Sequence, residues 1–418
     1  MRSPRKRLQN DRLKKKKMVT EKKYKRTVLS CYLGYTVQAI VNNFAPLLFI
    51  TFQQAYDIPL SKITLLITLN FGIQLIIDLL ATRLVDKIGY KISFLVALGF
   101  SSVGLVLLAF LPTVFPSPYI GLLIAVLVSA VGVGLIEVVV SPIMESCPTD
   151  NKEKSMSLLH SFYCFGHVGV ILLSTLYFAV FGIRNWRYLT LFLALFPIVT
   201  FVLFLKAPVK TLIPDGEKGM KIKELLLTPV FWLFMLMMTC AGAGEQAVSQ
   251  WASAFAEEGL GVSKTLGDLL GPTLFALCMG ISRFTYGKFA KKLKLSVYMP
   301  ICAILCTVSY LLITLVPNAV FNLIACGLCG FAIGIAWPGT FSTASKTLPR
   351  GGTTLFAFLA LAGDIGCTSG PTLVGLVSSY SGNMKFGILS AVVFPALLAL
   401  STVLFFLSRK KTKENTIE

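Results

Sequence analysis

The residues of this chain that could do chemistry are ionisable side chains inside long apolar stretches. Glu137 is followed by three valines, Asp364 stands next to glycine, and His167 lies between glycine and valine. Such groups are costly in a bilayer and need a reason to be there. Burial without a fixed cation favours the protonated acid, and histidine titrates near neutrality, so all three are predicted to exchange protons. The alternatives are a permanently protonated Glu137, an Asp364 that only joins helices, and a His167 that only packs.

A second group of polar and aromatic side chains has the chemistry to bind a small polar solute. Asn42 and Asn43 are neutral hydrogen-bonding groups suited to hydroxyls or amides. Trp251 offers an aromatic plane for a sugar ring or a cation, although a place in the interfacial aromatic belt would explain it equally well. The predicted solute-binding residues are Asn42, Asn43, Glu245, Gln246, Gln250, Trp251 and Trp337.

A third group is a stripe of polar residues at every fourth position of one apolar stretch. Its members are Asn70, Gln74, Asp78, Thr82 and Asp86. This spacing places them along one side of a helix, where we expect them to line a seam between moving parts. Their predicted role is gating rather than binding. The predicted gating residues are Asp78, Asp86 and Arg283.

The elements that carry these residues must be membrane helices. The chain has 418 residues and is 55% hydrophobic and 14% charged, whereas a soluble protein is about a quarter charged. A helix needs about 20 apolar residues to cross a bilayer, and no alternating barrel pattern is present. We predict an all-α membrane protein with twelve spans, at 27–52, 62–82, 91–112, 119–146, 155–182, 187–206, 227–256, 264–288, 295–316, 319–346, 353–380 and 385–407.

The distribution of positive charge predicts the orientation of these spans. Of 39 Lys and Arg residues, all fall on one side except Lys62, Arg184, Arg187, Lys264 and Lys385. Cytoplasmic loops carry the excess of positive charge, so both termini are predicted to lie in the cytoplasm of a multi-pass protein of the cell membrane. The basic segment 1–26 is predicted to be a disordered tail that contacts anionic lipid headgroups. Tyr24 is the one aromatic residue among its charges, so a nucleic-acid partner is not expected.

Internal repeats divide the chain into two halves. The basic, glycine-containing loop at 83–91 has a degraded second copy at 287–294. Gly166 to Gly169 matches Gly363 to Gly366, which makes Asp364 the repeat partner of His167, and Gly134 to Glu137 matches Gly334 to Trp337. Three matches with one offset indicate two similar bundles, with His167 and Asp364 expected to face each other. The predicted parts are a tail at 1–26, a six-helix bundle at 27–206, a linker at 207–226, a second six-helix bundle at 227–407 and a tail at 408–418.

These features resemble the major facilitator superfamily, and several blocks resemble its fucose permease branch of sugar:proton symporters. The blocks begin at Val41-Asn42-Asn43, at Gly132 and at Leu158-Leu159-His160, and a fourth is Gly244-Glu245 with Trp251. The resemblance implies two pseudo-symmetric six-helix bundles, and it implies a part in proton coupling for Glu137. The chain departs from the family three residues after its Asn pair, where those permeases carry an aspartate and this chain has Pro46. We expect a helix break there instead of a carboxylate.

The predicted function is secondary active transport of a small polar organic solute, a sugar or sugar derivative, by alternating access with proton symport. Proton-driven efflux of drug-like or metabolite compounds is the alternative within the same class. An intramembrane enzyme is the alternative outside it, but the chain has two histidines and lacks the metalloprotease and serine-hydrolase motifs. No metal, disulfide framework or cofactor is expected, only a proton or sodium as coupling ion. A monomer is expected.

Overall fold

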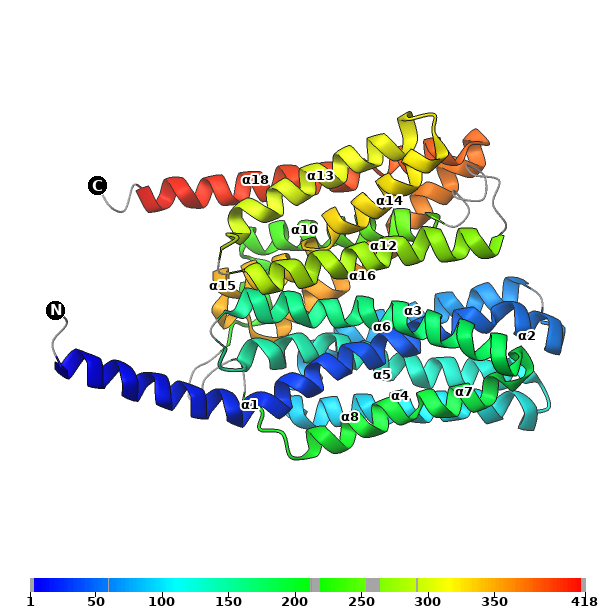
Figure 1. The fold of residues 1–418 in the computed structure, drawn as a ribbon, viewed down its shortest axis with the longest axis horizontal. Coiled ribbons are helices and arrows are strands. Elements are labelled where there is room, and N and C mark those ends of the chain that lie inside the picture. The colour runs from blue at the N-terminus through cyan, green and yellow to red at the C-terminus, as the bar shows by residue number, and fades with distance from the viewer. Residues whose placement is uncertain are drawn as a thin grey trace.

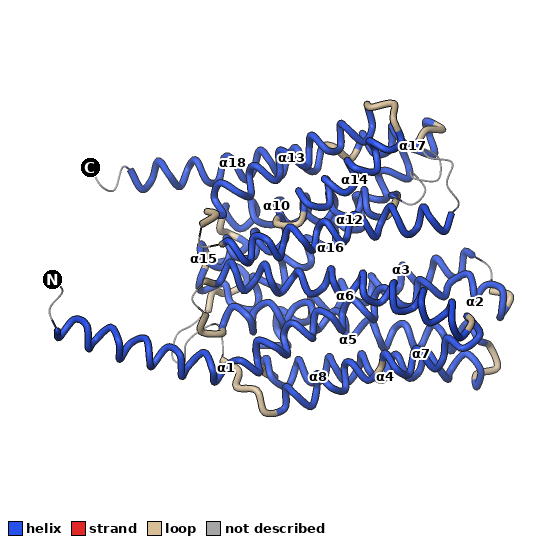
Figure 2. The backbone as a smooth tube through the Cα atoms, in the orientation of Figure 1, coloured by secondary structure: helices blue, strands red, loops and turns tan. Residues whose placement is uncertain are grey.

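The computed structural model describes residues 4–58, 60–149, 151–210, 212, 219–252, 264–290 and 292–414, and these described residues form helices joined by short loops (Figure 2). The helices run lengthwise in two groups (Figure 1). The first group contains α1 (Pro4–Phe44), η1 (Ala45–Leu48), α2 (Phe49–Tyr56), α3 (Leu60–Ile88), α4 (Tyr90–Val114), α5 (Pro118–Ser146), α6 (Lys152–Phe181), η2 (Ile183–Asn185), α7 (Trp186–Leu193) and α8 (Leu195–Leu205). The second contains α9 (Ile222–Leu226), α10 (Pro229–Ser249), α12 (Lys264–Phe289), α13 (Leu295–Leu315), α14 (Ala319–Ile333), α15 (Ala336–Thr347), η3 (Pro349–Gly351), α16 (Gly352–Ser381), α17 (Met384–Ser390) and α18 (Val393–Glu414).

The length and apolar composition of these helices suit a bilayer. Nine helical segments in the described part of the chain are long and apolar enough to cross a membrane, and α3 adds a shorter apolar segment at Leu69–Ala81. Many large apolar side chains point outward, such as Leu176 at 65% and Leu315 at 64% exposure. Apolar side chains on the outside of a helix bundle match the hydrocarbon chains of lipid, where they cost nothing.

Small residues let the helices approach closely inside each half. A Cβ added at Gly366 on α16 would lie 2.0 Å from the Thr239 carbonyl oxygen of α10. A Cβ added at Gly104 on α4 would lie 2.1 Å from the hydroxyl of Ser129 on α5. Membrane helices associate through such close backbone contact because apolar side chains gain little by leaving lipid. The pairs α4–α5 and α10–α16 are accordingly the most extensively packed pairs of helices.

The first predicted span contains the expected break. Helix α1 ends at Phe44, and Pro46 lies in the 3-10 turn η1 before α2 resumes the span. Proline lacks an amide hydrogen and its ring clashes with the preceding turn, so an α-helix does not continue through it.

The predicted disorder of the basic tail is wrong. Helix α1 is continuous from Pro4 and projects beyond the bundle, and α18 continues to Glu414 (Figure 1). Lysine, arginine, leucine and glutamine are good helix formers, and a helix already nucleated by a membrane span can be extended at little cost. Both termini therefore project from the same end of the molecule, called the termini side below.

The two halves meet through α3, α5 and α6 of the first half. Helices α3 and α5 pack against α16, and α6 packs against α12 and α15. The expectation that His167 on α6 faces Asp364 on α16 stays a prediction, since these two helices have different packing partners. Sequence repeats relate these helices by symmetry, but each one packs against the second span of the opposite half rather than against its own repeat partner.

Candidate functional site

A buried ion pair joins two helices of the second half at the centre of the molecule. The Arg283 Nη2 on α12 donates to Glu245 Oε2 on α10 at 2.9 Å, and the two side chains are 3% and 11% exposed. The Arg283 Nε also donates to the Gly334 carbonyl at 2.8 Å, at the break between α14 and α15. The guanidinium thus holds three helices of one half together.

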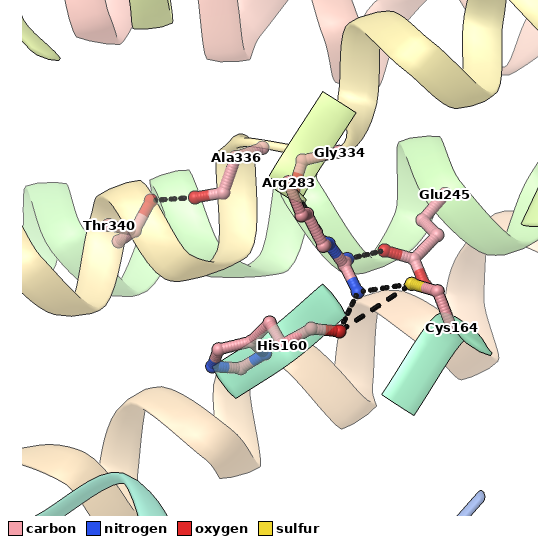
Figure 3. Close-up of polar contacts among 7 residues, drawn as sticks. All are labelled: His160, Cys164, Glu245, Arg283, Gly334, Ala336 and Thr340. Carbon is pink, nitrogen blue, oxygen red and sulfur yellow. Dashed lines mark hydrogen bonds and ion pairs between the residues drawn. The ribbon is translucent and has the colours of Figure 1, made fainter. Parts of the chain in front are cut away.

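The same arginine reaches across to the first half. Its Nη1 donates to the Cys164 Sγ at 3.0 Å and to the His160 carbonyl at 3.4 Å, both on α6 (Figure 3). The Arg283 carbonyl also accepts the hydroxyl of Ser157 at 2.6 Å. Arg283 lies on the boundary between the halves, where its predicted gating role would place it.

Sequence reasoning missed the pairing of Glu245 with Arg283, because it assigned one residue to solute binding and the other to gating. The two are 38 positions apart on different helices. A signal was available in the sequence. Glu245 is an acid and Arg283 is a base, and each lies inside an apolar span, where a charged side chain needs a partner of opposite charge.

Three carboxyl groups gather near the centre from three helices. Glu137 on α5 accepts a hydrogen bond from Gln38 Nε2 on α1 at 2.9 Å. The carboxyl groups of Asp78 on α3 and Asp364 on α16 lie close to each other, and both interact electrostatically with Glu137. We call Asp78, Glu137 and Asp364 the acid cluster. It unites two residues predicted to exchange protons with one predicted to act in gating.

The two histidines lie in aromatic surroundings on α6. The His160 ring centroid is 4.9 Å from that of Tyr35 and 5.8 Å from that of Phe341, and its buried Nε2 has no partner among the described residues. His167 contacts the edge of Tyr163 at 6.5 Å. These neighbours give His167 no acid to exchange a proton with directly.

Neutral polar groups line the same region of α1 and α6. Asn43 donates to the Ala39 carbonyl at 2.8 Å and is hydrogen-bonded to Tyr163. The Asn42 Oδ1 is buried and has no donor within the described part of the chain. An amide oxygen in this condition is available to a hydroxyl or amide of a ligand.

The remaining predicted solute-binding residues lie in the second half. Gln250 donates to the Gln246 side chain at 3.0 Å, and the Trp251 indole donates to the Pro371 carbonyl at 3.2 Å. Trp337 is 8% exposed and packs against Phe341 and the backbone of Gly363. Of Asp86 only the helical backbone in α3 is described, so its predicted gating side chain lies outside the described residues.

A polar network joins the two halves on the termini side, and sequence reasoning missed it. Glu153 accepts the hydroxyl of Tyr286 at 2.7 Å and pairs with Lys346. Glu145 accepts the hydroxyl of Ser345 at 3.3 Å. Toward this side, the side-chain hydrogen bonds and ion pairs between described residues of the two halves are Tyr90–Thr353, Glu145–Ser345, Glu153–Tyr286, Glu153–Lys346, Ser157–Arg283, His160–Arg283 and Cys164–Arg283. The halves are therefore closed together on the termini side.

The loop between α5 and α6 carries a thiol on this side. Burial raises the pKa of Cys147 to about 11, against the opposing effect of Lys152 nearby. The thiolate is the reactive form of cysteine, so this native thiol is expected to react slowly with alkylating reagents at neutral pH.

Two bundles of apolar helices, a buried polar centre between them and a polar network that joins them on the termini side define a multi-pass membrane protein of the two-bundle transporter class. The chain belongs to the Major Facilitator Superfamily, whose family description matches residues 31–371. It is therefore a secondary transporter of a small-molecule substrate, and not an enzyme. No curated protein sequence gives a significant match.

Solved structures of known transporters share the fold. The E. coli fucose:proton symporter FucP in its outward conformation superposes with a TM-score of 0.78 at 18% identity, covering 91% of this chain and 98% of that one. The proton:xylose symporter XylE gives 0.79 at 13% identity, covering 93% and 96%. The human organic anion transporter MFSD10 (TETRAN) gives 0.71 at 14% identity, covering 91% and 99%. The predicted all-helical, twelve-span major facilitator fold is thereby confirmed.

Proposed function

We propose that this transporter carries an uncharged, hydroxyl-rich organic solute, a sugar or sugar derivative, together with protons. The observation that supports this most is that the charged side chains near the centre of the molecule already have partners within the protein. Arg283 is paired with Glu245 and donates to three neutral acceptors, and the members of the acid cluster interact with one another. The polar atoms left without a partner include Asn42 Oδ1 and His160 Nε2, which suit the hydroxyl groups of a neutral ligand.

Aromatic rings beside the predicted solute-binding residues support the same class of solute. Tyr163 lies beside Asn43 and His167, and Trp251 is partly buried near the end of α10. Sugar rings present C–H faces that pack on aromatic planes while their hydroxyl groups bond to amides. The proposed solute-binding set is Asn42, Asn43, Gln246, Gln250 and Trp251, with Glu245 and Trp337 shaping its inner wall.

In an alternating-access cycle, the closed termini side corresponds to one state of the transporter. The charge asymmetry of the loops supports a cytoplasmic location for both termini, with 27–206 and 227–407 as the two moving bundles. Contacts between the halves on the termini side then correspond to an outward-facing state, ready to receive solute from outside. Import follows when the contacts made by Tyr90, Glu145 and Glu153 break and the opposite ends close.

Coupling to protons is proposed to pass through the acid cluster. Glu137 and Asp364 are buried between helices and no Lys or Arg pairs with them among the described residues. A carboxyl group in that environment is stabilised by binding a proton. His167 remains a prediction as a further proton carrier, through Tyr163 rather than through Asp364.

One observation favours a second candidate, transport of an organic anion. Arg283 is a buried cation at the centre of the molecule, and its pair with Glu245 could exchange for a pair with a carboxylated solute. Such a solute would have to displace a carboxylate at 2.9 Å that is already desolvated, which makes the exchange costly.

A ligand panel on purified protein tests the two candidates. Binding to the folded state raises the melting temperature, by a free energy of about 2.7 kcal/mol at a concentration 100 times Kd. Neutral monosaccharides should raise the melting temperature, and uptake of the responding sugar into proteoliposomes should increase when the lumen is made alkaline. Stabilisation by carboxylates with no response to neutral sugars would instead establish the organic-anion function. A response to sodium but not to pH would remove the proton from the proposal.

A further inference from the structure

We propose that Asp78 and Asp364 form an acid pair that holds a single shared proton across the boundary between the two halves. This pair would be the proton-binding site of the transport cycle. The inference deepens the proposed proton coupling and rests on it. It moves Asp78 from gating to proton binding and gives Asp364 a specific partner.

The geometry of the pair requires a proton. Asp78 lies on α3 and Asp364 on α16, two helices that pack against each other across the boundary. The side chains are 1% and 8% exposed. Both Asp78 oxygens and Asp364 Oδ2 are buried without a hydrogen-bond partner among the described residues, and the two carboxyl groups lie close enough to affect each other. Ionised carboxylates only accept hydrogen bonds, so two of them can share one only if one carries a proton.

The surroundings of the pair add a third carboxyl group and no cation. Glu137 on α5 faces both aspartates, and the Cys367 thiol on α16 lies near Asp364. Glu245 on α10 is already paired with Arg283, which also donates to Gly334, His160 and Cys164. No lysine or arginine among the described residues neutralises Asp78 or Asp364.

An independent, non-acidic side chain also points to a missing proton. Gln38 on α1 is 4% exposed and directs its amide into the cluster, where its nitrogen donates to Glu137. Its Oε1 is buried and has no donor. A buried amide oxygen left unsatisfied costs free energy, and a proton that moves within the cluster would supply the donor it lacks.

The proton balance of the step is simple. A proton from the outer medium adds to the Asp78 carboxylate and forms an O–H bond that donates to Asp364. Asp78 is assigned as the acid because it is the more deeply buried of the two. When the proton leaves to the inner medium, the O–H bond breaks and two like charges face each other across α3 and α16. Their repulsion loosens this contact between the halves only in the unloaded state.

The test counts protons on the purified, solute-free protein. Infrared spectroscopy detects the C=O stretch of a protonated carboxyl, and a pH step with an indicator dye counts the protons released. Asp78→Asn and Asp364→Asn each keep a hydrogen bond in the pair, since an amide donates to a carboxylate without a shared proton. Asp57→Asn, which changes an exposed loop acid in a left-handed conformation that asparagine tolerates, is the matched control.

A single shared proton predicts non-additive losses. Each single variant should lose one released proton and the same infrared band, and the double variant should lose no more than either alone. Asp57→Asn should keep that band. Two protons lost in the double variant, one from each residue, would show two independent acids and overturn the proposal.

Transport assays then separate this inference from the proposed function. A wild-type protein with the band but with no pH-driven uptake of any solute would refute the coupling while leaving the shared proton in place. Uptake that remains pH-driven in Asp78→Asn, with an unchanged melting temperature, would refute the role of the pair in coupling while leaving proton symport in place.

Discussion

The buried pair of Arg283 and Glu245 makes a quantitative prediction about stability. Glu245→Ala leaves the guanidinium with the carbonyls of Gly334 and His160 and the Cys164 sulfur, none of which carries charge. Arg283 is 3% exposed and cannot recover water around it. Removing one partner of a buried ion pair costs about 3–5 kcal/mol, because the other charge is left uncompensated.

Removing both charges should cost less than removing one. In Glu245→Ala/Arg283→Met no buried charge remains, and the loss is confined to the three other acceptors of Arg283. At about 0.6 kcal/mol for each hydrogen bond in a membrane protein, that loss is about 2 kcal/mol. The double variant is thus expected to be more stable than Glu245→Ala by about 2 kcal/mol, roughly thirtyfold in the unfolding equilibrium.

Reversible unfolding in a denaturing detergent, followed by the fluorescence of the four tryptophans, measures these differences. Glu224→Ala is the control, because it removes an exposed acid at the start of α9 and should cost at most about 1 kcal/mol. A double variant that is less stable than Glu245→Ala by the full cost of Arg283→Met would show additive effects. That result would mean that the two charges do not compensate each other and would refute the ion pair as described.

Three further predictions follow from the remaining sites. Glu137→Gln should abolish pH-driven accumulation of the solute, whereas exchange of solute at equal concentrations on both sides should survive, because exchange needs no net proton movement. If Glu137→Gln keeps pH-driven accumulation and Asp364→Asn loses it, Glu137 is excluded from the proton route. Tyr286→Phe removes a 2.7 Å hydrogen bond to Glu153 and should favour the inward-facing state about tenfold, measured by distances between spin labels on the two halves. Lys346→Ala removes a half-exposed partner of the same acid and should shift this equilibrium less, so a larger shift than for Tyr286→Phe would contradict the ranking. Cysteines introduced at Lys206 and at Lys385 should label from opposite sides of sealed cells, and labelling from the same side would refute the proposed topology.

The sequence predicted the helices well because the information that defines a membrane span is local. About 20 consecutive apolar residues make a span wherever they occur, and a proline such as Pro46 interrupts it for reasons that lie within one turn. The helical form of the basic tail was missed because charge was given more weight than helix propensity. Segment 4–26 is rich in residues that favour helix, and it adjoins a helix that already exists.

The contacts of the candidate site were less predictable because they depend on helix rotation and on the packing of distant segments. Hydropathy identified Glu137, Asp364, Glu245 and Arg283 as exceptional, and the structure places all four near the boundary between the halves. It did not indicate that Glu245 meets Arg283, or that Asp364 meets Asp78. Internal symmetry suggested only that His167 faces Asp364, and symmetry-related residues need not touch.

The α6–α12 contact and the α3–α16 contact between the halves carry different chemistry. This difference assigns them different roles. The α6–α12 contact depends on Arg283, which keeps its charge at any physiological pH and bonds the backbone of His160. The α3–α16 contact depends on Asp78 and Asp364, which can stay together only with a proton between them. A change of protonation therefore acts on one contact and leaves the other intact. The contact at Arg283 can then serve as a pivot about which the halves rotate, while the acid pair sets when α3 and α16 are free to move. If the contacts at Arg283 also opened with pH, this division of roles would fail, and spin labels placed beside each contact can distinguish the two cases.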